Sequence, residues 1–127
     1  MDEFGRTDFH YAIIDQELET VVRLLNSGVD VNQQDNHGWT ALHFACQNYD
    51  IEICQLLIDR KASIDIKDSD GSTPLFRATF ECRDESGELI KLLIKNGANP
   101  HEPNNYGNSP FSLAEKVANY DLTPHFR

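Results

Sequence analysis

The stretch GWTALHFA at residues 38–45 decides the fold, because three related stretches accompany it along the chain. They are GRTDFHYA at 5–12, GSTPLFRA at 71–78 and GNSPFSLA at 107–114. The threonine, or the serine that replaces it, returns after 33 residues (40 − 7), 33 residues (73 − 40) and 36 residues (109 − 73). A period of this length is typical of a stacked repeat protein. Such a stack offers an extended surface to a partner, so the repeat favours binding over catalysis.

Each full repeat predicts two short helices that follow a turn rich in Asp, Asn and Gly. The second helix carries an apolar run in each full repeat, within residues 18–25, 51–58 and 89–94. Such runs bury most of a helix between two neighbours. The first helix starts after a hydroxyl residue, whose oxygen can accept a backbone N–H of the first turn. These predicted N-caps are Thr7, Thr40, Thr73 and Ser109.

Glycine follows the second helix in the first and third repeats, at Gly28 and Gly97. A helix often ends in the left-handed conformation, which only glycine adopts cheaply. Lys61 stands at this place in the second repeat. We therefore expect Lys61 to have a positive φ, at a cost of about 1 kcal/mol.

The composition limits the classes of partner. The chain has 127 residues, enough for one domain, with 11 Lys and Arg against 21 Asp and Glu, so its formal net charge is −10. This charge argues against a nucleic-acid phosphate backbone, which needs a basic surface. It fits a partner with a basic surface, because long-range attraction speeds encounter. An acidic surface that only keeps the protein soluble explains the charge equally well.

The cysteines and the chain start indicate a cytoplasmic protein. Cys46, Cys54 and Cys82 are odd in number and form no C-x-x-C pair, so reduced thiols are expected rather than disulfides. We expect the first two in the core and Cys82 at the surface. The first residues, MDEFGR, show no signal peptide. No stretch approaches the roughly 20 apolar residues that span a membrane.

The repeats resemble the ankyrin repeat, whose T-P-L-H-x-A core matches residues 40–45 and 73–78. The resemblance covers residues 2 to about 118. It implies an all-α solenoid of antiparallel helix pairs with projecting hairpin-like loops, which together form an L-shaped stack. We expect repeats at about 2–34, 35–67 and 68–103, and a truncated C-terminal capping repeat at 104–127. Leu122 and Phe126 would cover its last apolar face. The third repeat carries three extra residues within 79–88.

No cluster of catalytic or metal-binding residues is expected. His10 and His43 occupy the histidine position of the motif, where a structural hydrogen bond to the loops explains them better than a metal or catalytic role. They have no carboxylate or cysteine at ligand spacing, so we expect no metal and no cofactor. No glycine-rich phosphate loop and no shielded pair of carboxylates is present, so no enzyme is expected.

The residues that the stack does not need are the candidates for partner binding. Aromatic and arginine side chains dominate the energy of protein interfaces, which points to Trp39, the only tryptophan, on an exposed loop tip. The alternative is that Trp39 lies flat on an adjacent loop and Phe4 helps to cap the open end. Phe80, beside the insertion, is a candidate partner contact. The alternative is that Phe80 packs beneath the insertion. The candidate residues are Phe4, Arg6, Asn36, His37, Trp39, Gln47, Asn48, Ser69, Asp70, Ser72, Phe80, Glu81 and Tyr106.

The sequence thus predicts a monomeric, non-catalytic module that binds another protein through its concave face and loop tips. A narrower hypothesis comes from resemblance alone. The segments NNYGNSP at 104–110 and ANYD at 118–121 are similar to small stand-alone bacterial ankyrin-repeat proteins, which include immunity proteins that block a cognate toxin. The alternatives are a general adaptor, an assembly partner of itself, or a small-molecule-binding or enzymatic accessory domain, which would need a closed pocket.

Overall fold

The computed structural model describes residues 2–82, 86–116 and 121–126. In this part of the chain it contains α-helices, one 3-10 helix and no strand. The elements in chain order are α1 (Asp8–Ile14), α2 (Leu18–Asn26), α3 (Ala41–Gln47), α4 (Ile51–Asp59), α5 (Pro74–Glu81), α6 (Glu88–Lys95), α7 (Pro110–Lys116) and η1 (Thr123–Phe126).

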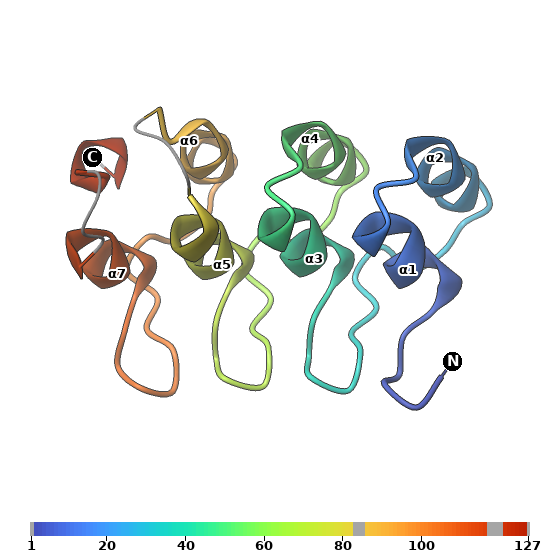
Figure 1. Cartoon of the computed structure of the whole chain (residues 1–127), viewed down its shortest axis with the longest axis horizontal. Coiled ribbons are helices and arrows are strands. Elements are labelled where there is room, and N and C mark those ends of the chain that lie inside the picture. The colour runs from blue at the N-terminus through green and yellow to red at the C-terminus, as the bar shows by residue number, and fades with distance from the viewer. Residues whose placement is uncertain (1, 83–85, 117–120, 127) are drawn as a thin grey trace.

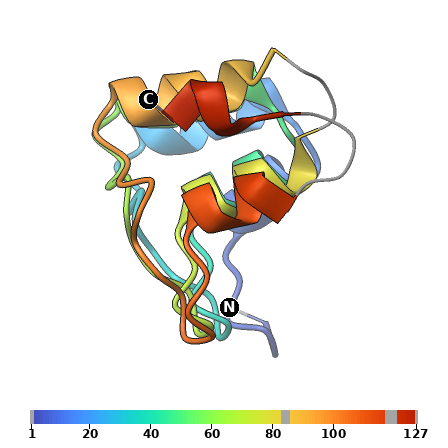
Figure 2. The same ribbon diagram turned by 90° about the vertical axis from the view of Figure 1, so that its left-hand side faces the viewer.

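The elements form a two-layered stack with projecting loops (Figure 1). Helices α1, α3, α5 and α7 make the layer next to the loops, and α2, α4, α6 and η1 make the outer layer. The loops before α3, α5 and α7 lie side by side and extend away from both layers as the second arm of an L (Figure 2). The all-α solenoid predicted from the repeat is confirmed. None of the helices in the described ranges is long and apolar enough to span a membrane.

The helix starts follow from the repeated hydroxyl residue. The side chains of Thr7, Thr40 and Thr73 each accept the N–H three residues on, as predicted. Ser109 does the same for the N–H of Ser112, over 3.1 Å. A cap of this kind stabilises a helix by about 1 kcal/mol, which matters for helices this short.

His10 and His43 complete the caps, and their structural role is confirmed. Nδ1 of each ring accepts the backbone N–H of the cap threonine, at 3.0 Å for His10 and 3.1 Å for His43. The other ring nitrogen, Nε2, therefore donates. It lies 2.8 Å from the Gln33 carbonyl oxygen in His10 and 3.0 Å from the Ser72 carbonyl oxygen in His43. Each histidine thus joins a helix start to the next loop.

The core runs along the stack between the two layers. Cys46 and Cys54 are fully buried there, 3.9 Å apart at sulfur, as small core residues were expected to be. The expectation for Cys82 is wrong. It is buried, and its sulfur lies 3.6 Å from the Tyr49 hydroxyl, because α5 extends to Glu81 and carries the following residue into the stack.

Positive φ angles mark the ends of both helix layers. Lys61 has φ 70°, which confirms the expectation drawn from Gly28 and Gly97, whose φ angles are 90° and 99°. Gln16 and Tyr49 also have positive φ, 58° and 52°, where α1 and α3 turn into the second helix. They stand one repeat apart (49 − 16 = 33), and no glycine at that place signals the turn in the sequence.

A ladder of backbone hydrogen bonds joins the loops. The N–H of Asn36 donates to Phe4, that of Ser69 to His37 and that of Asn105 to Asp70, each over 2.8 Å. The asparagine side chains add a second bond. Nδ2 of Asn36 donates to the Glu3 carbonyl over 2.9 Å, and Nδ2 of Asn105 donates to the Ser69 carbonyl over 3.1 Å. The loops therefore have a fixed spacing.

The last described segment closes the end of the stack. Leu122 is fully buried and Phe126 is 7% exposed, and η1 packs on both α6 and α7. The ring of Phe126 meets that of Phe111 edge-on at 5.9 Å. Arg83, Asp84 and Glu85 of the insertion lie outside the described residues, as does residue 118, near which the resemblance ends.

Candidate functional site

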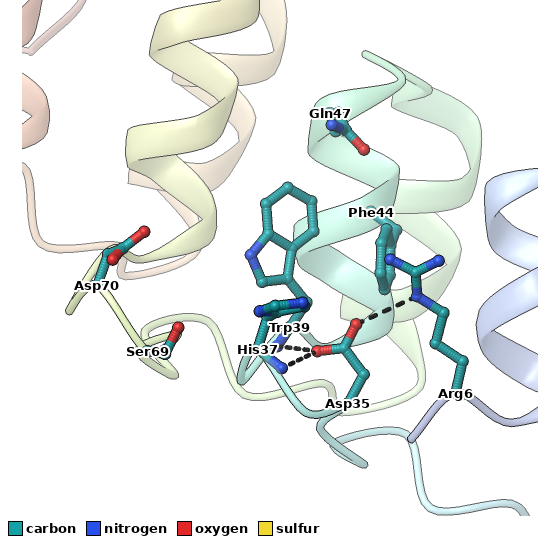
Figure 3. Close-up of a pocket in the computed structure, with 8 residues that line it drawn as sticks. All are labelled: Arg6, Asp35, His37, Trp39, Phe44, Gln47, Ser69 and Asp70. Atoms are coloured by element: carbon teal, nitrogen blue, oxygen red, sulfur yellow. Dashed lines mark hydrogen bonds and ion pairs between the residues drawn. The ribbon is translucent and has the colours of Figure 1, made fainter. Parts of the chain in front are cut away.

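A shallow groove lies in the inner corner of the L, where α3 meets the loops (Figure 3). It has a volume of about 270 Å³. Trp39 and His37 stand in its middle, with Ser69 and Asp70 on one side and Arg6 and Phe44 on the other. The residues that line it are Arg6, Asp35, His37, Trp39, Phe44, Gln47, Ser69 and Asp70.

Asp35 organises the floor of the groove. Its side chain is almost completely buried and accepts the N–H groups of His37 and Trp39, both over 2.9 Å. Its second oxygen lies 3.4 Å from Nε of Arg6. One carboxylate thus shapes a loop of the second repeat and orients an arginine of the first. Sequence reasoning missed Asp35, although its equivalents were visible at the start of the other loops, as Asp2, Asp68 and Asn104.

Trp39 does not lie on an exposed loop tip, as the sequence suggested, and it does not lie flat on a loop either. It is half-buried and packs on its own repeat, with ring centroids 4.9 Å from Phe44 and 5.7 Å from His43. Its ring points from the loop toward α3 (Figure 3). The guanidinium of Arg77 lies over the ring, 5.2 Å from its centroid.

Two arginines and four aromatic rings form one continuous row across three repeats. Arg6 lies over Phe4 at 4.8 Å and over Phe44 at 5.2 Å, and Phe44 packs on Trp39. Arg77 continues the row to Phe80 at 5.1 Å, and it lies 3.6 Å from Glu81. We call this set the arginine–aromatic row; its members in order are Phe4, Arg6, Phe44, Trp39, Arg77 and Phe80.

The row contains residues that sequence reasoning missed, namely Phe44 and Arg77. They stand at the same place in successive repeats (77 − 44 = 33). The motif leaves this position variable, so alignment of the repeats could have marked it as one that the scaffold does not require; Phe44 is nevertheless only 4% exposed there. Nothing in the sequence tells that Arg77 reaches the tryptophan of the preceding repeat.

Hydrogen bonds hold the guanidinium at the N-terminal end of the row in place. Burial by itself lowers the pKa of Arg6, yet hydrogen bonds to Tyr11 and Asp35 raise that pKa above its ordinary value. Asp2 has a lowered pKa, chiefly because the Tyr11 hydroxyl donates to its carboxylate. Arg6 is therefore a fixed cation within a polar cluster that crosses from the first loop to the second.

Three residues that the sequence predicted as partner contacts instead make hydrogen bonds within the fold. Ser72 is buried, and its carbonyl accepts the bond from His43. The side chain of Asn36 donates to the Glu3 carbonyl and so holds the first loop in place. Nδ2 of Asn48 donates to the carbonyls of Ile13 and Ile14 at the end of α1, over 3.3 and 3.0 Å. These side chains explain the cohesion of neighbouring repeats, which a single sequence does not distinguish from partner contacts.

The remaining predicted residues line the groove, lie exposed around it or, in the case of Glu81, lie beside Arg77. The groove brings together Arg6, His37, Trp39, Gln47, Ser69 and Asp70. Three aromatic side chains are exposed around it: Phe4 by 42%, Phe80 by 61% and Tyr106 by 74%. Phe80 therefore does not pack beneath the insertion. Glu81 is half-buried beside Arg77. The described residues contain no group of three or more His, Cys, Asp or Glu side chains that could hold a metal ion.

Comparison with known proteins identifies the repeat. Residues 9–104 match a family model of ankyrin repeats in three copies. The chain is 35% identical over 121 residues to serine/threonine-protein kinase 12 of Arabidopsis thaliana. The match covers 94% of this chain and 25% of the kinase. It is 38% identical over 94 residues to inversin of Canis lupus familiaris, covering 74% of this chain and 8% of inversin.

A viral protein is similar as well. The chain is 34% identical over 119 residues to ankyrin repeat protein OPG189 of variola virus, covering 87% of this chain and 21% of the viral protein. The chain thus spans a quarter or less of the length of these three relatives.

Proposed function

Because the chain belongs to the ankyrin-repeat family, whose repeats are protein-interaction modules, we propose that it binds another protein without catalysis, through the concave face and the loop tips. The observation that carries this proposal is the arginine–aromatic row. Three repeats contribute side chains of the kind that dominate protein interfaces to one surface.

The row supplies rigid contact area. Each guanidinium is stacked on aromatic rings and lies beside a carboxylate, Asp35 for Arg6 and Glu81 for Arg77. Side chains that are already ordered lose little conformational entropy when a partner binds, so more of the contact energy remains as affinity. Trp39 at the centre and Phe80 at the exposed end are the anchors that we expect to matter most.

The expected partner has a basic surface. The formal net charge of −10 would steer such a partner toward the acidic protein and raise the association rate, an effect that salt screens. A groove of about 270 Å³ lies just below the roughly 300 to 1,000 Å³ of small-molecule sites, which favours protein side chains over a small ligand.

Co-purification from the native cell, followed by mass spectrometry, would name the partner, and variants would test the site. We expect Trp39→Ala to weaken binding by at least about 2 kcal/mol, roughly 30-fold, as removal of a hot spot does. Because Trp39 also packs on Phe44, circular dichroism must show an intact fold. Val22→Ala, a half-buried change on α2 in the outer layer, is the matched control. Unchanged affinity of a folded Trp39→Ala protein would remove this surface from the interface.

A narrower proposal is that the partner is a basic toxin, such as a nuclease, which the protein would neutralise. The acidity of the chain supports it, because a basic toxin would be attracted to an acidic surface. The relatives reported above are eukaryotic and viral and lend it no support. Rescue of cells that express a toxin encoded beside this gene would establish it, and failure to bind that toxin would end it.

The alternative of a general adaptor keeps the same binding surface. Similarity to a kinase and to inversin, each of which the chain matches over a small part, supports a role as an interaction segment. Sizing chromatography separates a monomeric binder from a self-assembling one, and the proposal expects a monomer.

A further inference from the structure

We propose that Asp70 anchors an arginine side chain of the partner protein at the edge of the groove. This inference rests on the proposed function, because it assigns the chemistry of one contact within the same surface. It concerns the side of Trp39 and His37 that faces away from Arg6 (Figure 3).

The charges of the groove leave one carboxylate uncompensated. Arg6 and Asp35 pair at 3.4 Å, and next to the groove Arg77 and Glu81 pair at 3.6 Å. Asp70 also lines the groove, and no ion pair within the described residues includes it. The paired charges cancel, so the groove presents a single negative charge, located at Asp70.

The fold does not explain this carboxylate as it explains the other loop acids. Asp35 and Asp68 each accept two N–H groups of their own loop and thereby hold its turn. Asp70 uses its backbone N–H for that turn, but its side chain is exposed. The contact of its carboxylate within the described residues is the Tyr106 hydroxyl at 3.5 Å, a long hydrogen bond.

The loops on either side of Asp70 each carry a ring residue at the equivalent position. Phe4, His37, Asp70 and Tyr106 occupy the same tip position in successive loops, and the carbonyls of the first three accept the N–H of the next loop. The ladder fixes His37 on the loop before Asp70 and Tyr106 on the loop after it. An exposed carboxylate in contact with Tyr106, whose side chain is 74% exposed, suits a planar cation that can also stack on the ring.

Arginine fits this arrangement better than lysine. A guanidinium can bind a carboxylate through two parallel hydrogen bonds and can stack on aromatic faces at the same time, whereas an ammonium is a point charge that holds its water strongly. The net charge of −10 draws such a cation toward the surface. Arg77 lies close to Trp39 but is itself beside Glu81, so its charge is offset.

The direct test is an NMR titration of the whole chain with N-acetyl-arginine amide. We expect a saturable shift of the backbone amides of residues 69–71 and of Tyr106. Asp70→Asn should weaken this binding about tenfold. Glu52→Gln, which removes the same charge from an exposed position on α4 in the outer layer, should leave it unchanged. N-acetyl-lysine amide should bind more weakly, and N-acetyl-glutamine amide should cause no shift at these residues.

Equal shifts in wild type and Asp70→Asn, or shifts confined to other loops, would overturn the assignment. Binding of the variants to the co-purified partner distinguishes failure of this assignment from failure of the proposed function. If Trp39→Ala abolishes partner binding while Asp70→Asn retains it, the arginine site fails and the binding surface stands. If neither change affects the partner, the proposed surface fails as well, and the titration still decides whether Asp70 binds arginine.

Discussion

The guanidinium carbon of Arg77 lies 5.2 Å from the centroid of the Trp39 ring. The contact joins the third repeat to the second and covers part of the only tryptophan of the chain, whose ring also packs on Phe44 at 4.9 Å. Trp39 is thus held by two repeats, and its environment reports on the interface between them as well as on any partner that fills the groove.

Removal of Arg77 should therefore be visible in the tryptophan fluorescence. We expect Arg77→Ala to move the emission maximum to longer wavelength, because the indole becomes more exposed to water. The free energy of unfolding should fall by about 0.5 to 1 kcal/mol, the usual worth of an exposed cation–π contact. Arg60→Ala, at the end of α4, removes an exposed arginine far from the ring and should leave the spectrum unchanged. Identical spectra for wild type and Arg77→Ala would show that the arginine does not cover Trp39 in solution.

The loop ladder predicts different costs for alanine at two glycines. Gly38 and Gly107 both have positive φ, 77° and 81°, so alanine strains the backbone at both. At Gly38 the added Cβ would also lie 2.9 Å from Cα of Asp68 and from the Ser69 nitrogen, whereas nothing lies within 4 Å at Gly107. We expect Gly107→Ala to cost about 1 kcal/mol and Gly38→Ala clearly more, as measured by urea unfolding. Equal losses would mean that the loops do not pack this closely.

Glycine at the end of α4 should stabilise the protein. Lys61 has φ 70°, and Lys61→Gly removes the steric strain of a side chain in this conformation. The greater freedom of glycine in the unfolded chain offsets part of the gain, so we expect an increase of up to about 1 kcal/mol in the free energy of unfolding. Arg60→Gly, at φ −95°, is the control and should lower the melting temperature. A lower melting temperature for Lys61→Gly would contradict the left-handed helix end.

His43 should make stability depend on pH. Burial lowers the pKa of His43 below its ordinary value of 6.5 in the folded state, so the folded protein favours the neutral ring. The unfolded chain then binds more protons, and stability falls as the pH drops below about 6.5 toward the folded pKa. His43→Gln retains a capping residue at the third helical position but does not titrate.

The measurement is the melting temperature at pH 7.5 and at pH 5.5 for both proteins. We expect the wild type to lose more stability between these values than His43→Gln, because the other histidines are common to both. Parallel losses would show that His43 titrates alike in the folded and unfolded states.

Much of the scaffold follows from local chemistry that repeats in the sequence. The period of 33 residues predicts the stack, the cap threonines begin the first helices, and the register of Lys61 predicts its positive φ. Each of these features depends on residues a few positions apart, so a single chain is enough to infer them. Residues that act between repeats were assigned less well. Asn36, Asn48 and Ser72 resemble free polar surface in the sequence, yet their groups serve the neighbouring repeat.

The sequence by itself determined the repeat, the fold and the acidic character of this protein. Only the tertiary structure decided that Trp39 turns inward, that Arg6 and Arg77 of different repeats stack on the aromatic rings, and that Asp70 is left without a cation among the described residues. The physical reason is distance along the chain. Helix caps and turns are set by neighbours in sequence, whereas the contacts of Arg6 with Asp35 and Phe44 and of Arg77 with Trp39 join side chains about one repeat apart, and these partners become known only when the repeats lie side by side.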